Sequence, residues 1–273
     1  MAVPIFRASV PKSHPLIHSL FSTSFTDETL KKRRMLVSCA PSATKPVREE
    51  LSFCVGTHLI PHPSKVEKGG EDAFFVSTYN GGVIAVADGV SGWAEQKVDP
   101  SLFPKELMAY ASSFVEDVEQ VNDNPQVLIG KAHAATSSIG SATVIVAMLE
   151  RNGILKIANV GDCGLRVIRE VVSSVELVEG DTIVMGSDGL FDNVFDHEIV
   201  SNLTGYKDVA EAAKALANLA SNHSLDAKFD SPYIIEARAR GFEAPFWKKI
   251  LGMKLTGGKP DDITVVVGQV VSL

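Results

Sequence analysis

Four aspartates stand at the ends of segments whose composition is that of buried strands. They lie in the stretches GGEDAFF (69–75), VADGVSGW (86–93), GSDGLFDNV (186–194) and DDITVVV (261–267). A carboxylate at the end of a buried strand is unfavourable unless a positive group pairs with it. Carboxylates, backbone carbonyls and water are the ligands that Mg²⁺ and Mn²⁺ prefer. We therefore expect Asp72, Asp88, Asp188 and Asp261 to converge on two divalent cations roughly 3.5 to 4 Å apart, which would acidify a shared water molecule.

The acidic residues also allow a plainer interpretation. An isolated Asp-Gly is usually only a turn, and it is the set of four, each beside a β-branched run, that favours a metal site. Asp192 and Asp196 are expected to cap or solvate the helix after Leu190. Asp99 is expected to help start a helix near Ser101.

Residue periodicity predicts the elements that position these aspartates. Apolar residues at helical spacing predict helices near residues 107–118, 127–135 and 207–221, and Ser231-Pro232 predicts the start of another. Strands are expected over residues 52–60, 73–78, 83–87, 142–149, 154–159, 165–168, 182–186 and 263–272. Hairpin-linked strands come in runs and do not alternate one-for-one with helices. The pattern therefore favours layered antiparallel sheets with helices outside, an α+β fold.

Composition excludes several classes of function. The net charge of -7 argues against nucleic-acid binding. No apolar stretch approaches the roughly 20 residues that cross a bilayer, so we expect no transmembrane segment. The three cysteines, Cys39, Cys54 and Cys163, form no CxxC pair and fit a reducing compartment.

The amino-terminal segment differs from the rest of the chain. It is rich in Ser, Lys and Arg, and its few acidic residues include Asp27 and Glu28. This composition is typical of an organellar transit peptide, with a disordered basic tail as the alternative. We expect residues 1–45 to be a disordered transit peptide and residues 46–273 to be the folded domain. Chloroplast stroma is the expected destination, and mitochondrion is the second choice.

The stretches quoted above, together with SATVIVAML (141–149) and NVGDCG (159–164), occur in the order seen in metal-dependent protein phosphatases of type 2C. The chain resembles this family over about residues 50–273. DGVSGW, SPYIIEARARG and GGKPDDITVVV are most similar to short organellar members, among them plant chloroplast enzymes that dephosphorylate photosystem II core proteins. The resemblance implies a four-layer α-β-β-α sandwich of antiparallel sheets flanked by helices.

The resemblance also implies an activity. It is the Mn²⁺- or Mg²⁺-dependent hydrolysis of phosphoserine and phosphothreonine in chloroplast proteins, by a hydroxide at a dinuclear metal site. Substrates would be thylakoid phosphoproteins, photosystem II core proteins above all, and we expect a monomer.

Site roles follow from the resemblance, residue by residue. Asp88 would bridge both metals, and Gly89 would lend its carbonyl to one. Asp188 and Asp261 would hold the other metal, and Asp72 would act mainly through water. Asp262 stands where the family often has Asn, which makes Asp261 the better candidate ligand.

Asp162, in NVGDCG, matches a position linked to a weak third metal shared with Asp188. The alternative for Asp162 is a turn between two strands.

Two departures from the family pattern affect the chemistry. Val90 stands where many relatives have a His assigned as the general acid. A metal-bound water or another His would then protonate the leaving group. His62 is one candidate, with a role as a surface loop residue as its alternative. Where relatives have a phosphate-binding Arg, this chain offers Lys65 and Lys68. We expect Lys68 to contact the phosphate, with a solvated loop lysine as the alternative.

The chain also resembles a shortened family member. Relatives have some tens of residues more after Glu170, and losing them would expose a sheet edge. This leaves a second function open, an inactive form that binds phosphoprotein or competes with the full-length phosphatase. The aromatic and basic residues of segment 226–258 either form a docking surface or belong to helices packed on the sandwich.

Overall fold

The computed structural model describes residues 50–117, 121, 123–169, 176–242 and 254–273. Contacts divide the chain into Met1–Lys45 and Pro46–Leu273, and every described residue belongs to the second unit. The expected transit peptide, residues 1–45, and the junction at Glu170 lie outside the described residues.

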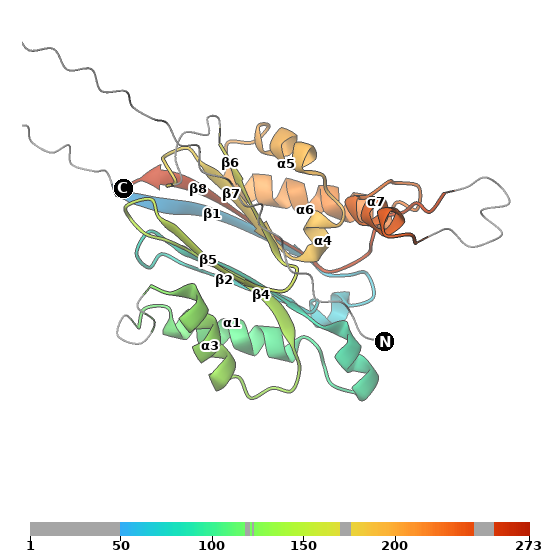
Figure 1. Ribbon diagram of the computed structural model, residues 1–273, viewed down its shortest axis with the longest axis horizontal. Coiled ribbons are helices and arrows are strands. Elements are labelled where there is room, and N and C mark those ends of the chain that lie inside the picture. The colour runs from blue at the N-terminus through green and yellow to red at the C-terminus, as the bar shows by residue number, and fades with distance from the viewer. Residues whose placement is uncertain (1–49, 118–120, 122, 170–175, 243–253) are drawn as a thin grey trace, which may run out of the picture. The chain divides into compact units, whose positions relative to one another are not determined.

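Two four-stranded sheets form the centre of this unit, and every neighbouring pair of strands is antiparallel (Figure 1). The first sheet has the order β1 (Leu51–Ile60), β8 (Ile263–Ser272), β7 (Thr182–Gly186) and β6 (Gly164–Ile168). The second has the order β2 (Asp72–Ser77), β3 (Val83–Gly89), β4 (Ala142–Leu149) and β5 (Leu155–Val160).

Helices cover the outer face of each sheet, as Figure 1 shows. The second sheet carries α1 (Leu102–Phe114) and α3 (Pro125–Ala135), and the first carries α4 (Asp188–Phe191), α5 (Asp196–Leu203) and α6 (Val209–Leu225). A further helix, α7 (Pro232–Ala239), follows, and two 3-10 helices, η1 (Val66–Lys68) and η2 (Ser91–Gln96), flank the ends of β2 and β3. The layer order is α-β-β-α, so the expected fold class is confirmed.

The alternation of side chains along β3 shows why the layers stack in this order. Val83, Ala85 and Ala87 pack against α1 and α3. Ile84 and Val86 face the opposite sheet. Successive side chains of a strand point to opposite faces of the sheet, so a fully apolar strand is buried on both faces. Each sheet can therefore bind helices on one face and its partner sheet on the other.

The elements agree closely with those predicted from periodicity. The Ser231 hydroxyl accepts a hydrogen bond from the Ile234 amide at 3.2 Å and caps α7, as expected. The Asp99 carboxylate accepts from the Ser101 amide at 3.0 Å just before α1, also as expected. Sequence patterns did not predict η1 or η2, because 3-10 helices of three and six residues are too short to show a periodicity. In the part of the chain described, no helix combines the length and the hydropathy needed to cross a membrane.

Candidate metal and active site

The candidate aspartates gather where corresponding ends of the two sheets meet. Asp72 at the start of β2 lies opposite Asp88 at the end of β3. In the other sheet, β7 ends at Gly186, just before Asp188, and β8 begins after Asp261 and Asp262. The Thr264 hydroxyl of β8 donates to the Asp72 carboxylate of β2 at 2.6 Å and joins the two ends.

Glycines allow the segments to approach at this point. A Cβ on Gly89 would lie 2.6 Å from the Pro100 carbonyl oxygen and 2.8 Å from that of Glu71. A Cβ on Gly189 would lie 2.0 Å from the Asp262 carbonyl oxygen. Any side chain at either position would push these segments apart. The Asp-Gly pairs at 88–89 and 188–189 therefore place a carboxylate beside a close backbone contact that only glycine permits.

Burial and mutual repulsion raise the pKa values of Asp72, Asp88 and Asp261. Burial raises the pKa of Asp72 to about 7. Burial, followed by the charges of Asp72, Asp188 and Asp261, raises the pKa of Asp88 to about 10. Burial and the Asp188 charge raise the pKa of Asp261 as well. The mutual effects show that the four carboxylates share one electrostatic site, and a cation there would favour their charged forms.

The donor set fits a divalent cation. Oδ1 of Asp72 and Oδ1 of Asp188 are buried and have no hydrogen-bond partner among the described residues. Buried carboxylate oxygens are normally satisfied, so two unpartnered ones at a single site indicate a ligand. Asp72 is 2% exposed, which leaves little access for bulk water to compensate.

A lysine occupies part of the same site. The Lys259 ammonium contacts the Asp188 carboxylate and lies 2.7 Å from that of Asp192 and 3.3 Å from that of Asp261. Burial lowers the pKa of Lys259, but the charges of Asp188 and Asp192 outweigh it, and the net pKa is raised. With the side chains in this arrangement, no group of three or more His, Cys, Asp or Glu in the described ranges is placed to hold a metal ion.

The expectation for Asp192 was wrong. Its carboxylate neither caps a helix nor faces solvent alone, because it pairs with Lys259 inside the cluster. Burial raises its pKa to about 6, against the lowering effect of Lys259. A signal was present in the sequence, since Asp192 follows Asp188 by four residues and lies one helical turn away on the same face. Asp196 is exposed, as expected, and forms an ion pair with Arg166 at 2.8 Å.

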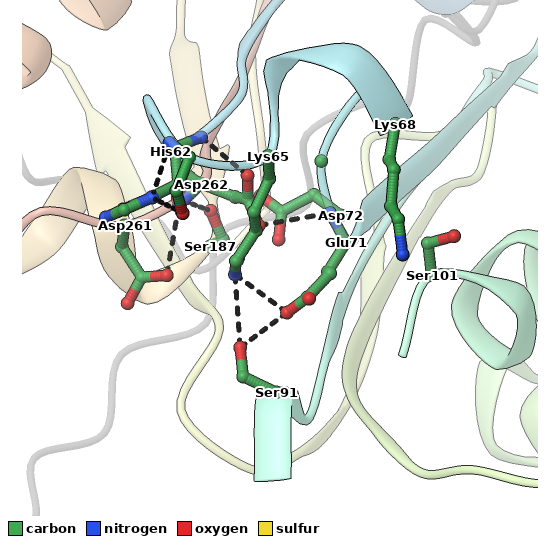
Figure 2. A network of polar contacts seen from close by, with 12 residues as sticks. His62, Lys65, Lys68, Glu71, Asp72, Ser91, Ser101, Ser187, Asp261 and Asp262 are labelled. Carbon is green, nitrogen blue, oxygen red and sulfur yellow. Dashed lines mark hydrogen bonds and ion pairs between the residues drawn. The ribbon is translucent and has the colours of Figure 1, made fainter. Parts of the chain in front are cut away.

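A second lysine–carboxylate network lies beside the first (Figure 2). The Lys65 ammonium lies 2.7 Å from the Glu71 carboxylate and 3.0 Å from that of Asp262. It also donates to the Ser91 hydroxyl at 3.1 Å, and that hydroxyl donates to Glu71. The network connects the loop before β2, the segment before β8 and the start of η2.

Asp261 and Asp262 have different surroundings, although they are adjacent in sequence. The Asp262 carboxylate accepts from the His62 amide at 2.7 Å, from the Glu71 amide at 3.0 Å and from Lys65. It is 1% exposed and fully used inside the protein. The Asp261 carboxylate faces Lys259 and accepts from the Asp262 amide at 2.9 Å. This agrees with the preference for Asp261 as the candidate ligand.

The remaining candidates lie at the edge of the cluster. The Lys68 side chain is 69% exposed and pairs with Asp99 at 3.5 Å, and Figure 2 shows it pointing away from the Lys65 network toward Ser101. The His62 ring nitrogen Nδ1 lies 2.8 Å from the Ser64 hydroxyl. Asp162 is exposed in the loop between β5 and β6, and its charge contributes to the raised pKa of Asp192.

Segment 226–258 packs beside the cluster as far as it is described. The Tyr233 amide at the start of α7 donates to the Asp192 carbonyl at 3.1 Å. The Ser231 hydroxyl donates to the Gly257 carbonyl at 2.8 Å. The aromatic and basic residues Phe246, Trp247, Lys248 and Lys249 lie outside the described residues, so the docking alternative stays a prediction.

Comparison with known proteins gives several strong similarities, although no family model matches the chain. "Probable protein phosphatase 2C 26" of Arabidopsis thaliana is 55% identical, and the alignment covers 100% of both chains. "Probable protein phosphatase 2C 1" of Oryza sativa subsp. japonica is 52% identical over 91% of this chain and 88% of the relative.

Solved structures show the same architecture. An X-ray structure of the photosystem II phosphatase PBCP is 57% identical, with a TM-score of 0.76, over 81% of this chain and 100% of that one. The catalytic domain of the serine threonine protein phosphatase PstP, in complex with two manganese ions, shares the fold at 19% identity and a TM-score of 0.53, over 81% of this chain and 100% of that one.

One alignment also bears on the length of the chain. The Arabidopsis relative aligns over 304 positions, whereas this chain has 273 residues, so at least 31 aligned positions have no counterpart here. The difference is of the size expected for a shortened member.

The Arabidopsis relative is identical to this chain at more than half of the aligned positions, over the full length of both chains. This chain therefore belongs to the protein phosphatase 2C family of serine/threonine phosphatases.

Proposed function

We propose that this chain is a divalent-metal-dependent phosphatase that hydrolyses phosphoserine and phosphothreonine in chloroplast proteins. One observation carries the chemistry. Strand-end carboxylates from both sheets share a buried site, and Oδ1 of Asp72 and Oδ1 of Asp188 have no hydrogen-bond partner among the described residues. Lys259 neutralises only one side of this site, so the two unpartnered oxygens support a divalent cation there, and the family relationship indicates the reaction.

Each acidic residue would have its own role in holding the metal ions. Asp88 and the Gly89 carbonyl would hold one ion, with Asp88 shared between both ions, and Asp188 and Asp261 would hold the second. Asp72 would act mainly through water, and Asp162 would contribute to a weak third site with Asp188. When bound, Mn²⁺ or Mg²⁺ would acidify a water molecule and neutralise charge on the phosphoryl oxygens.

The protein's own groups would bind and orient the substrate. Lys68 is exposed beside the cluster and pairs loosely with Asp99 at 3.5 Å, so its ammonium can exchange that partner for a phosphate. The Lys65 network would fix the start of η2 and the loop before β2 on either side of the phosphate. Val90 has no proton to give, so either a metal-bound water or His62 would protonate the leaving oxygen.

The proposed substrates are thylakoid phosphoproteins, photosystem II core proteins in particular. Support comes from the 57% identity to the photosystem II phosphatase PBCP across 100% of that chain. The basic, Ser-rich composition of residues 1–45 supports delivery to the chloroplast stroma, with mitochondrion as the second choice. We propose that the chain works as a monomer and takes no nucleic-acid partner.

A second function has one observation in its favour. At least 31 aligned positions of a close relative have no counterpart here, and β6 pairs with β7 alone among the described strands. A strand left at a sheet edge exposes unpaired backbone groups. A shortened form could therefore bind phosphoprotein without turnover and compete with the full-length phosphatase.

Phosphate release from a phosphothreonine peptide separates the two functions. The full chain is assayed with Mn²⁺ and with EDTA, beside Asp188→Asn as the inactive control and Asp196→Asn as the matched surface control. Release that requires Mn²⁺ and is lost only in Asp188→Asn supports the enzyme. Peptide binding without release, by protein shown by circular dichroism to be folded, supports the competing form.

A further inference from the structure

The Lys259 ammonium supplies the positive charge at one side of the aspartate cluster, where a metal ion would otherwise do so. It contacts Asp188 and lies 2.7 Å from Asp192 and 3.3 Å from Asp261. These carboxylates come from α4, from the residue that ends it and from the segment before β8. One positive charge therefore pairs with three carboxylates. The fold brings Asp188 and Asp192 to Lys259 from about 70 residues away in the chain.

The backbone of Lys259 is fixed, so its ammonium is directed at this site. The Lys259 amide donates to Asn193 Oδ1 at 2.8 Å, and Asn193 Nδ2 donates back to the Lys259 carbonyl at 2.9 Å. Asn193 is fully buried, and Pro260 restricts the backbone of the residue before it. The ring of Tyr233, centred 5.5 Å from the ammonium, closes one side of the site.

Two of the three carboxylates, Asp188 and Asp261, are those proposed to hold the second metal ion. The ammonium lies on Oδ2 of Asp188 and Oδ2 of Asp261, whereas the unpartnered oxygen of Asp188 is Oδ1. A divalent cation held by the same two carboxylates would lie within a few ångströms of the ammonium, and repulsion between the two positive charges opposes joint occupancy. Without either cation, the cluster would hold buried carboxylates with no counter-charge, which is strongly destabilising.

We propose, on the basis of the proposed function, that Lys259 is a built-in competitor of the divalent cation. It neutralises Asp188, Asp192 and Asp261 in the metal-free protein, and a divalent cation must displace it to bind. Lys259 thereby stabilises the metal-free fold and lowers the affinity for metal. A lysine that was only a structural counter-ion would stay in place when metal binds.

Calorimetric titration of Mn²⁺ into the full chain tests the competition. Lys259→Met removes the charge and keeps most of the side-chain length. Lys254→Met is the matched control, because Lys254 is exposed and pairs with Asp230 at 2.6 Å. We expect Lys259→Met to bind Mn²⁺ at least about fivefold more tightly than wild type. Lys259→Arg keeps the charge and should bind as wild type does, and Lys254→Met should change nothing.

Thermal melting of the same proteins gives a readout independent of catalysis. In EDTA, Lys259→Met should melt below wild type, because three carboxylates lose their counter-charge. In saturating Mn²⁺ the difference should vanish or reverse. A difference that is the same with and without Mn²⁺ would overturn the proposal.

Chemical labelling of the wild-type chain tests displacement itself and does not depend on how a variant folds. Acetylation of Lys259, followed by mass spectrometry, should be slow in EDTA and faster in Mn²⁺, while Lys254 serves as the internal reference. Unchanged labelling, or equal Mn²⁺ affinity of Lys259→Met and wild type, would overturn the competitor and leave the metal site standing. Absence of Mn²⁺ binding in every protein would overturn both the competitor and the proposed function.

Discussion

Two lysine–carboxylate clusters flank the adjacent residues Asp261 and Asp262, and they differ in how far their carboxylates are satisfied. In the Lys65 cluster, the Asp262 carboxylate accepts two backbone amides and the lysine, and it is 1% exposed. In the Lys259 cluster, Asp188 Oδ1 has no partner among the described residues. The Asp262 carboxylate of the first cluster is bonded through both of its oxygens, whereas Asp188 in the second has one oxygen available to a ligand.

The difference shows how neighbouring carboxylates acquire separate functions. A carboxylate held by backbone amides fixes loops, because those donors cannot leave without unfolding the segment. Among the described residues, Oδ2 of Asp261 faces only the long side chain of Lys259, at 3.3 Å, and an oxygen held in this way can exchange the lysine for another cation. Hydrogen-bond satisfaction, more than sequence position, therefore separates the structural Asp262 from the candidate ligand Asp261.

Removing the candidate metal ligand Asp261 should affect activity more than any other change considered. Asp261→Asn should lower Mn²⁺-dependent phosphate release by at least about a thousandfold, because a residue acting within a catalytic unit is rarely replaceable. The melting temperature of the metal-free chain should change little. Kinetic assays on both proteins check this, and activity close to wild type in Asp261→Asn would remove Asp261 from the site.

Removing the structural carboxylate of Asp262 should reduce stability. Asp262→Ala removes the acceptor of the His62 and Glu71 amides and one of the two carboxylates that pair with Lys65, so the free energy of unfolding should fall by about 3–5 kcal/mol. Urea unfolding measures this loss. Lys65→Met should cost less in the Asp262→Ala background than in the wild-type chain, because its ion pair with Asp262 is already absent there. Strictly additive losses would show that Lys65 and Asp262 do not interact.

A smaller effect should follow from pH in the metal-free protein. The folded-state pKa values of Asp72 and Asp88, about 7 and about 10, lie above the ordinary value of 3.8. The folded chain therefore binds more protons than the unfolded chain, and stability is lost as pH rises from about 4 through these values. In EDTA the melting temperature should fall by at least about 5 °C between about pH 5 and about pH 8.

Saturating Mn²⁺ should reduce this pH dependence, since a bound cation favours the charged carboxylates. Asp88→Asn should flatten it as well, because one of the titrating groups is removed. A melting temperature that rises over the same pH interval in EDTA would contradict the raised pKa values.

The smallest expected effect concerns the exposed lysine outside both clusters. Lys68→Ala should raise the KM for a phosphopeptide about fivefold, equivalent to about 1 kcal/mol, and leave stability unchanged. Lys214→Ala, an exposed lysine on α6, is the control. If Lys65→Met raises KM while Lys68→Ala does not, the phosphate contact belongs to Lys65.

Much of the fold and the acidic part of the site could be predicted from the sequence. Asp72, Asp88, Asp188 and Asp261 each adjoin an apolar strand, so their placement follows from the strands themselves. The Asp-Gly pairs carried a second signal, explained by the close approach of Asp262 to Gly189. These patterns involve residues close together in the chain, so a single sequence is enough to recognise them.

The cationic part of the site could not be predicted in the same way. Lys259 reaches Asp188 and Asp192 across about 70 residues, and nothing near either end specifies that contact. Lys65 and Lys68 occupy one loop, and a single turn of 3-10 helix directs the first inward and the second to solvent. Such choices depend on tertiary packing, which spacing alone does not encode.

The most direct test of the metal site is a crystal structure of the chain grown with Mn²⁺, with anomalous difference maps. We expect Mn²⁺ peaks bounded by Asp72, Asp88, Asp188 and Asp261, with the Lys259 ammonium withdrawn from Asp188 and Asp261. Saturating Mn²⁺ with no peak among these carboxylates, or a Lys259 that still joins them, would contradict this expectation.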